Sequence, residues 1–228
     1  MSAGARIAVA LDTPDLTRLA HLAARLGGEA DILKVGLEAL TAIGPRAVEA
    51  AAQYAPVFCD LKLHDIPQTV AGAAAAAAAH GVSMITVHAS GGPAMIDAAV
   101  KAAPTVEILA VTILTSLDDA TLAELGIGRT GQVVPRLALG AINAGATGIV
   151  CAGDEVSSVR RTVGAAATIV VPGVRPEGTS MHDQARVVTP HMALLAGADV
   201  LVVGRPVTAA GDPVAALRSL RQRMTDGA

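Results

Sequence analysis

The segment around Lys62 carries the residue types best suited to chemistry in this sequence. Lys62 lies two residues after Asp60 and three residues before Asp65. Residues two apart in a strand project from the same face, so the side chains of Asp60 and Lys62 should lie together. Because neighbouring carboxylates keep a lysine protonated, Lys62 is suited to donate a proton to a reacting group. An inward lysine must be matched by carboxylates, and Lys34, in another apolar run, can add a second cation to the network.

Metal-dependent and Schiff-base chemistry fit this segment less well. The positive charge of Lys62, between Asp60 and Asp65, would repel a metal cation. A Schiff-base aldolase needs a neutral lysine as its nucleophile, and the two carboxylates oppose that state. The sequence also lacks the Cys and His spacing of zinc sites, the phosphate-binding P-loop and the glycine-rich dinucleotide fingerprint. We therefore expect no metal site and no cofactor.

Short apolar runs that alternate with helical patterns must position these charges. Most of the runs are too apolar for a strand with one wet face, so they indicate parallel strands buried on both sides. The spacing of the runs is close to that of one strand–helix unit. The eight predicted strands are Arg6–Leu11, Ile32–Val35, Val57–Leu61, Met84–His88, Ile108–Leu114, Gly148–Cys151, Thr168–Val171 and Val200–Val203.

Eight such units in 228 residues predict an α/β fold of the TIM (β/α)8 barrel type. A doubly wound sheet is the alternative, but it usually has a glycine-rich first turn, whereas the first turn here is Asp12–Asp15. No linker, repeat or change in composition divides the chain, so we expect one domain over residues 1–228. Helices are expected over Asp15–Leu26, Pro45–Gln53, Gln68–His80, Gly92–Ala102, Gly131–Ala144 and Thr189–Ala196, with Asp15 and Thr189 as caps.

Polar residues recur at the carboxyl ends of the predicted strands, where TIM barrels place their chemistry. These residues are Asp12, Lys34, Asp60, Lys62, His88, Thr115, Ser116, Pro172, Gly204 and Arg205. The alternative is that these charges form salt bridges that only stabilise the barrel. That interpretation explains any one pair, but it explains four alternating charges less well. We expect His88 to be a buried, hydrogen-bonded residue. Strand alternation places Cys59 on the face opposite Asp60 and Lys62. His64 lies past the predicted strand end, and we expect it to point away from the Asp60 and Lys62 face.

The motif around Lys62 resembles the signature of the orotidine 5'-phosphate decarboxylase family. The matching residues are Asp60-x-Lys62-x-x-Asp65-Ile66-Pro67-x-Thr69. The resemblance covers nearly the whole chain and includes Pro172-Gly173-Val174-Arg175, Gln184, Thr189-Pro190 and Gly204-Arg205-Pro206. The shorter Asp-x-Lys-x-x-Asp element also occurs in sugar-phosphate decarboxylases and aldolases of the same superfamily, which are the alternative. The block that contains Arg175, Gln184 and Thr189 favours the orotidylate branch.

This resemblance implies a lyase that converts orotidine 5'-phosphate to UMP and CO2 without a cofactor, as the last step of de novo pyrimidine synthesis. Lys62 would stabilise the carbanion at C6 and then protonate it, while Asp60 and Asp65 flank the substrate carboxylate. Lys34 would orient Asp60 and contact the ribose. A non-catalytic nucleotide-binding barrel is a further alternative. It would need a broken charge network, and all four charges are present.

The resemblance also implies which residues bind the substrate and a second subunit. The expected contacts are Asp12, Lys34 and Thr69 with the ribose, Thr115 and Ser116 with the pyrimidine, and Pro172, Arg175, Gln184, Gly204 and Arg205 around the phosphate. The segment 173–186 is rich in Gly, Pro and polar residues, which is typical of a lid. A homodimer is implied in which Asp65, Ile66 and Thr69 enter the site of the partner.

Composition excludes several other classes of function. A net charge of -3, with no Trp and only one Phe and one Tyr, argues against a nucleic-acid surface. The apolar runs are too short to span a bilayer, and the N-terminus does not resemble a signal peptide, so no membrane partner is expected. Cys59 and Cys151 lie inside apolar runs and are typical of buried thiols in a reducing cytoplasm, where we expect the protein to work.

Overall fold

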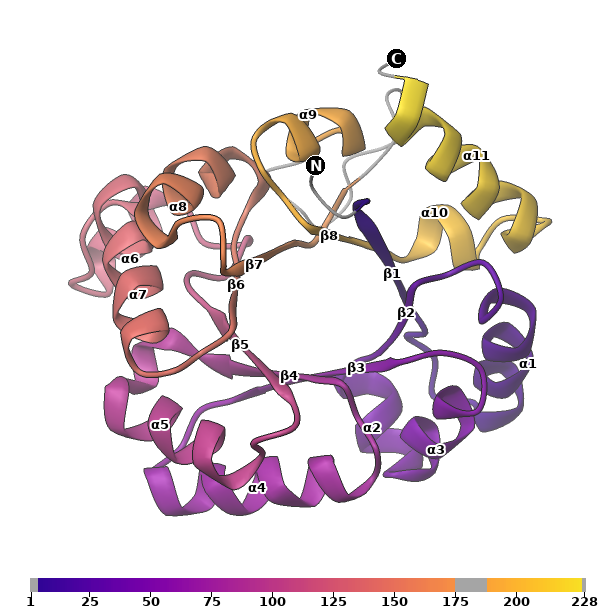
Figure 1. Cartoon of the computed structure of the whole chain (residues 1–228), viewed down its shortest axis with the longest axis horizontal. Helices are drawn as coiled ribbons and strands as arrows, with labels where there is room; N and C mark the ends of the chain where they lie inside the picture. The colour runs from indigo at the N-terminus through magenta and orange to yellow at the C-terminus, as the bar shows by residue number, and fades with distance from the viewer. Residues whose placement is uncertain (1–3, 175–187, 227–228) are drawn as a thin grey trace.

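Eight parallel strands close into a barrel, and the helices form a ring around it (Figure 1). The structure is a computed structural model that describes residues 4–174 and 188–226. The strands follow one another around the barrel in sequence order, and β1 pairs with β8 to close it. Their bounds are β1 (Arg6–Ala10), β2 (Ile32–Val35), β3 (Val57–Leu63), β4 (Met84–His88), β5 (Glu107–Val111), β6 (Gly148–Val150), β7 (Thr168–Val171) and β8 (Val200–Val203). The predicted TIM barrel is confirmed.

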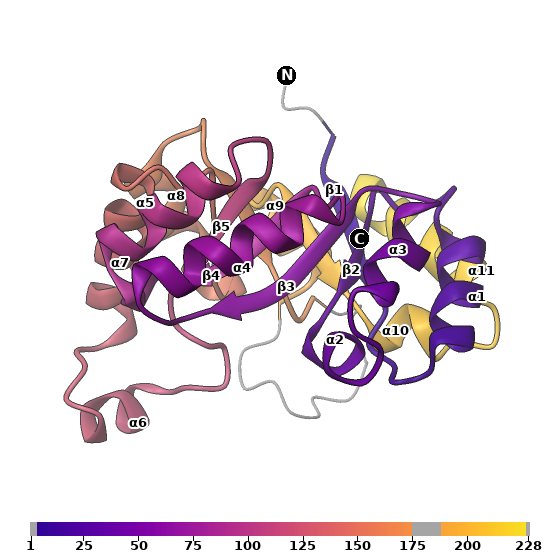
Figure 2. The ribbon, with the colours of Figure 1, turned by 90° about the horizontal axis from the view of Figure 1, so that it is seen from below.

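Some helices of the ring begin at a residue whose side chain caps them. The carboxylate of Asp15 accepts hydrogen bonds from the N–H groups of Thr17 and Arg18, and the hydroxyl of Thr189 accepts one from Met192. The helices are α1 (Leu16–Leu26), α2 (Leu37–Ile43), α3 (Arg46–Ala52), α4 (Pro67–Ala79), α5 (Pro93–Ala102), α6 (Asp119–Glu124), α7 (Thr130–Asn143), α8 (Val156–Val163), α9 (Pro190–Leu195), α10 (Arg205–Thr208) and α11 (Pro213–Asp226). Figure 2 shows α6 standing away from the ring, on the connection between β5 and α7. Within residues 4–174 and 188–226, no helix is long and apolar enough to cross a membrane.

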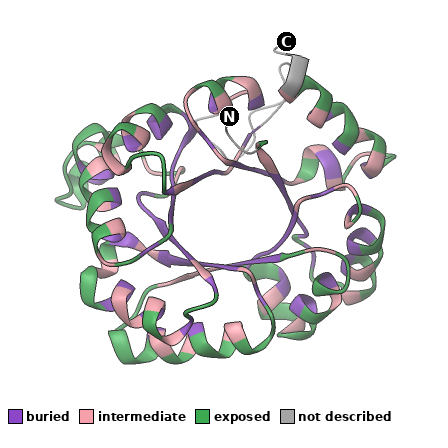
Figure 3. Cartoon of the chain, in the orientation of Figure 1, coloured by how far each residue is buried: buried purple, intermediate pink, exposed green. Residues whose placement is uncertain are grey.

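Two apolar layers hold the barrel together. The interior layer is made by alternate strand residues, among them Phe58, Met84 and Leu109, which are almost completely buried. The second layer lies between the strands and the helices, so both faces of each strand are buried, as the near-continuous apolar runs predict. Figure 3 shows the same pattern, with buried strands and helices that expose their outer faces. Apart from Asp60 in β3 and Thr86 in β4, the polar residues of the strands lie at or next to the strand ends.

Two ion pairs join strands to outer helices at the amino-terminal end of the barrel. The carboxylate of Asp31, just before β2, accepts a hydrogen bond from the N–H of Ile7 in β1 at 2.7 Å and pairs with Arg221 of α11 at 2.8 Å. Asp199, just before β8, makes the same kind of contact with the backbone of β7 and pairs with Arg160 of α8. Each aspartate thus joins two neighbouring strands to an outer helix. These contacts lie at the end of the strands opposite the predicted site.

Candidate active site

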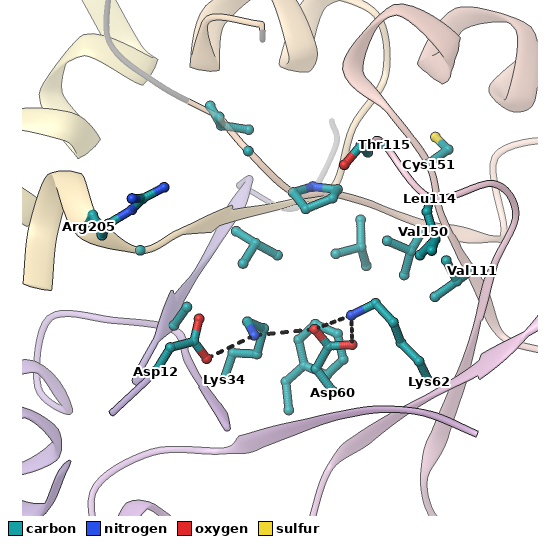
Figure 4. Close-up of a pocket in the computed structure, with 18 of the residues that line it drawn as sticks. Asp12, Lys34, Asp60, Lys62, Val111, Leu114, Thr115, Val150, Cys151 and Arg205 are labelled. Atoms are coloured by element: carbon teal, nitrogen blue, oxygen red, sulfur yellow. Dashed lines mark hydrogen bonds and ion pairs between the residues drawn. The ribbon is translucent and has the colours of Figure 1, made fainter. Parts of the chain in front are cut away.

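A cavity of about 330 Å³ opens at the carboxyl ends of the strands (Figure 4). This is the end at which TIM barrels place their chemistry, and the volume is within the range of small-ligand sites. One wall is charged and carries Asp12, Lys34, Asp60 and Lys62. The rest of the lining is mostly apolar, apart from Thr115 and Arg205. The cavity therefore offers a charged surface, an apolar surface and a cationic end to one ligand.

The charged wall is a row of alternating charges that come from three consecutive strands. Lys34 of β2 places its Nζ 3.5 Å from Asp12 Oδ1 and 3.2 Å from Asp60 Oδ2. Lys62 places its Nζ 2.8 Å from both carboxylate oxygens of Asp60. Figure 4 shows the four side chains in this order along the cavity wall. The predicted network of Lys34, Asp60 and Lys62 is thus formed, and Asp12 extends it on the side of Lys34.

Asp60 is the centre of this row and stays ionised because of its neighbours. Burial alone would raise the pKa of the Asp60 carboxyl, but Lys34 and Lys62, with hydrogen bonds from Lys62 and Thr86, hold the pKa below its usual value. Lys34 is only 7% exposed, and the two carboxylates beside it compensate its buried charge. Loss of either carboxylate would leave a buried cation without full compensation.

Gly36 makes room for the contact between Asp12 and Lys34. A Cβ at this position would lie 2.6 Å from Asp12 Oδ1 and 3.0 Å from Lys34 Nζ. Any larger residue would therefore push these two groups aside. This role of Gly36 could not be predicted, because a close approach between side chains from two strands leaves no local signal in the sequence.

The backbone at Lys62 departs from the regular strand that the sequence predicts. Cys59 pairs with Ile85 of β4, but the next pair is Leu63 with Val87, so the register shifts through a bulge. Lys62 has φ of 50°, the only positive φ of a non-glycine residue in the described ranges. The left-handed conformation costs roughly 1–2 kcal/mol for a residue with a Cβ. The predicted proximity of Asp60 and Lys62 is correct, but simple alternation along a strand is not its cause.

His64 comes directly after β3 and is exposed. The ring of His64 lies 5.2 Å from the ring of His88, at the end of β4. Burial, followed by the proximity of His64 and Lys62, lowers the pKa of His88, so His88 is neutral at neutral pH. His88 is half-buried, and neither histidine lines the cavity. His64 is expected to point away from the face of Asp60 and Lys62, and the cavity lining does not include it.

The apolar part of the lining was not predicted as part of the site. It comes from the ends of β5 to β8 and the loops after them, and it includes Val111, Ile113, Leu114, Val150, Cys151, Val170 and Val202. Burial raises the pKa of the Cys151 thiol, so this group lines the cavity as a neutral side chain. Cys59 is in the core outside the barrel interior, as predicted, and burial raises its pKa to about 11. Neither thiol has the properties of a nucleophile.

The predicted binding residues do not all line the cavity. Those that line the cavity are Asp12, Lys34, Thr115, Pro172, Gly204 and Arg205. Ser116 is exposed and outside the lining, as are Asp65, Ile66 and Thr69 near the start of α4. The carboxylate of Asp65 accepts a hydrogen bond from the N–H of Ile66, and it forms no ion pair with a residue that the structure describes. Arg175 and Gln184 lie outside the described residues.

The donor set of the cavity offers little to a metal ion. Over the described ranges, no group of three or more His, Cys, Asp or Glu side chains is arranged to hold one. The two carboxylates of the charged wall, Asp12 and Asp60, both contact the ammonium group of Lys34. A dication between them would have to displace that group.

This fold and site define a class: a (β/α)8 barrel enzyme that holds alternating aspartates and lysines at the carboxyl ends of β1 to β3. The model of the Orotidine 5'-phosphate decarboxylase / HUMPS family matches residues 5–220. The chain belongs to this family.

Individual relatives cover almost the full chain. The chain is 53% identical to the orotidine 5'-phosphate decarboxylase of Anaeromyxobacter sp. (strain K) over 96% of this chain and 98% of the relative. It is 51% identical to that of Thermobifida fusca (strain YX), over 95% and 94% of the two chains. The crystal structure of orotidine 5'-phosphate decarboxylase from Lactobacillus acidophilus superimposes with a TM-score of 0.85 at 34% identity, covering 97% of this chain and 100% of that one.

Proposed function

We propose that this protein decarboxylates orotidine 5'-phosphate to UMP and CO2, the last step of de novo pyrimidine synthesis. The observation that carries the proposal is the Lys62 ammonium group, which faces the cavity and lies 2.8 Å from the ionised Asp60 carboxylate. This pair is suited to proton donation beside a developing negative charge. The matched family model also covers enzymes other than the decarboxylase, but the relatives that are about half identical are orotidine 5'-phosphate decarboxylases.

The shape of the cavity supports one orientation of the nucleotide. Arg205 lies on the far side of the cavity from Lys62, and its guanidinium can bind a phosphate through two parallel hydrogen bonds (Figure 4). The apolar wall that contains Val111 and Val150 suits the flat pyrimidine ring. The ribose would then lie along Asp12 and Lys34. This orientation brings C6 of the pyrimidine and its carboxylate to Lys62 and Asp60.

The proposed reaction balances without a cofactor. The bond between C6 and the carboxylate breaks, CO2 leaves, and the electron pair remains on C6. The ammonium group of Lys62 stabilises this pair and then transfers its proton to C6, so a C–H bond replaces the C–C bond. The neutral amine of Lys62 recovers a proton from water. Asp60 holds Lys62 in place, and its negative charge beside the substrate carboxylate is relieved when CO2 leaves.

The remaining roles are proposed from the resemblance and from position. Lys34 orients Asp60 and contacts the ribose together with Asp12, and Thr115 contacts the pyrimidine. Ser116 would join Thr115 in that contact. Pro172, Gly204 and Arg205 surround the phosphate, and Arg175 and Gln184 would complete this group.

We also propose a homodimer in which each site is shared. Asp65, Ile66 and Thr69 are exposed and do not line the cavity of their own chain, although they belong to the family motif. Ile66 is 66% exposed, which is unusual for a large apolar side chain and favours burial against another subunit. Contact across a two-fold axis would place these three residues in the site of the partner. Asp65 would then supply the second carboxylate beside Lys62.

We place the protein in the cytoplasm. Cys59 and Cys151 are free and buried, which suits a reducing compartment.

The activity test is incubation of the purified protein with orotidine 5'-phosphate, with and without EDTA. We expect the absorbance of the substrate to fall, UMP to form, and the rate to be the same in EDTA. A six-carbon sugar phosphate with a divalent metal serves as the comparison substrate. If the protein turns over the sugar phosphate in a metal-dependent reaction and does not turn over orotidine 5'-phosphate, the alternative activity of the superfamily is established and the proposed decarboxylase function is rejected.

Replacing Arg205 with alanine should weaken binding of the substrate through its phosphate. A charge-assisted hydrogen bond contributes about 1.5–3 kcal/mol, so KM should rise roughly 10- to 100-fold. Orotidine without a phosphate should be affected far less. Arg161, which is exposed and outside the cavity lining, gives the matched control Arg161→Ala. Equal losses for the two substrates would show that Arg205 does not bind the phosphate.

A further inference from the structure

The bulge in β3 leaves a gap in the hydrogen-bonded ladder between β3 and β4, and Thr86 fills it. Three residues of β3, Asp60 to Lys62, lie between the pairs Cys59–Ile85 and Leu63–Val87, whereas β4 has only Thr86 in the same interval. The N–H of Lys62 is therefore not part of the regular ladder. It donates instead to the side-chain oxygen of Thr86, at 2.8 Å.

The same hydroxyl contacts the carboxylate that pairs with Lys62. Thr86 Oγ1 lies 2.9 Å from Asp60 Oδ1. A backbone N–H can only donate and a carboxylate can only accept, so the hydroxyl accepts from Lys62 and donates to Asp60. Thr86 is completely buried, and water therefore cannot take its place. One oxygen atom thus joins the backbone of Lys62 to the side chain of Asp60.

This arrangement acts on the two groups on which the proposed chemistry depends. Lys62 is held in a left-handed conformation that the chain adopts only if other contacts enforce it. Asp60 must hold its carboxylate so that both oxygens reach Lys62 Nζ at 2.8 Å. Thr86 itself does not line the cavity and would not touch the substrate.

We propose that Thr86 is a positioning residue, whose hydroxyl fixes the backbone of Lys62 and the carboxylate of Asp60 in the geometry that proton transfer requires. The expected effect of Thr86 on kcat rests on the proposed decarboxylase function. Its effect on the positions of Lys62 and Asp60 does not. In the sequence, Thr86 is one residue of the predicted strand Met84–His88. The hydroxyl acquires its role only because β3 carries a bulge opposite to it.

Thr86→Val removes the hydroxyl and keeps the shape of the side chain. We expect kcat to fall at least about tenfold, since a small misplacement of a reacting group can cost up to about 100-fold. KM should change less than about threefold, because the phosphate contacts are elsewhere. Thr86→Ser keeps the hydroxyl and should retain kcat within about threefold of the wild type. Thr112 is also buried and hydrogen-bonded, to the carbonyl of Val150, so Thr112→Val is the control for loss of a buried hydroxyl.

A crystal structure of Thr86→Val should show Lys62 out of the left-handed region or Asp60 rotated away from Lys62. The proposal is overturned if Thr86→Val keeps both the geometry and kcat, if Thr86→Ser is as slow as Thr86→Val, or if Thr112→Val loses as much activity. If Thr86→Val does not fold, Thr86→Ser decides: retained kcat supports the proposal and a tenfold loss overturns it. If the wild type does not turn over orotidine 5'-phosphate, the proposed function fails, and the crystal structure still decides the role of Thr86.

Discussion

Replacing Lys62 with alanine should reduce kcat for decarboxylation at least about 100-fold, since a positioned general acid typically contributes this much or more. The variant loses both the proton donor and the cation that lies 2.8 Å from Asp60 in the cavity. Lys34 still neutralises Asp60, so the protein should fold and the site should keep its shape. Steady-state turnover of orotidine 5'-phosphate measures the loss.

Nucleotide binding separates this role of Lys62 from general damage to the site. Lys62→Ala should still bind UMP, because the proposed phosphate contact at Arg205 is on the far side of the cavity. Lys101 is exposed on α5 and pairs with Asp97 of its own helix, so Lys101→Ala is the control for removal of a lysine. Retention of more than about a tenth of the wild-type kcat in Lys62→Ala would reject Lys62 as the proton donor.

Mixing two inactive variants, Lys62→Ala and Asp65→Ala, should restore about a quarter of the wild-type activity. Each homodimer is expected to be nearly inactive. In a mixed dimer with shared sites, one site receives both defects and the other receives neither. Random exchange makes about half of the dimers mixed, and half of their sites are intact. Turnover is measured after the two proteins have been mixed under conditions that exchange subunits.

A second mixture provides the control for this experiment. Asp60 and Lys62 contact each other within one chain, so Asp60→Ala mixed with Lys62→Ala should restore nothing. Each site of that mixed dimer has one defect. If subunit exchange is verified and the first mixture also stays inactive, Asp65 serves its own chain and the shared site is wrong. If both mixtures recover activity, the recovery does not come from active sites shared between subunits.

The barrel could be predicted from the sequence because its signals are local. Each strand is a short and mostly apolar run, and Asp15 and Thr189 cap their helices through contacts within three residues. The charged wall could also be predicted, since charged residues at the ends of apolar runs must meet at one end of a barrel. The strand bounds differ mainly at β5, which ends at Val111 and not at Leu114, since the apolar pattern continues into the loop that lines the cavity.

The features that could not be predicted depend on contacts between distant segments. The bulge at Lys62 is stabilised by Thr86, which is 24 residues away. Gly36 matters because Asp12 and Lys34 approach its α-carbon, and that approach exists only after β1 and β2 have paired. For Asp65, the sequence could not show which site it serves. The structure places it beyond the end of β3, where the extended Ile66 and the following Pro67 turn the chain into α4.

The ion pairs of Asp31 and Asp199 have a consequence for how this protein can change. They join strands and helices at the amino-terminal end of the barrel, whereas the charged row lies at the other end. Strands of three to seven residues separate the two ends by about 10 Å or more. Substitutions that far apart, with no shared partner, usually have additive effects on stability. Substitutions near Arg160 and Arg221, whether engineered or evolved, can therefore change the thermal stability of the protein without altering the residues of the charged row.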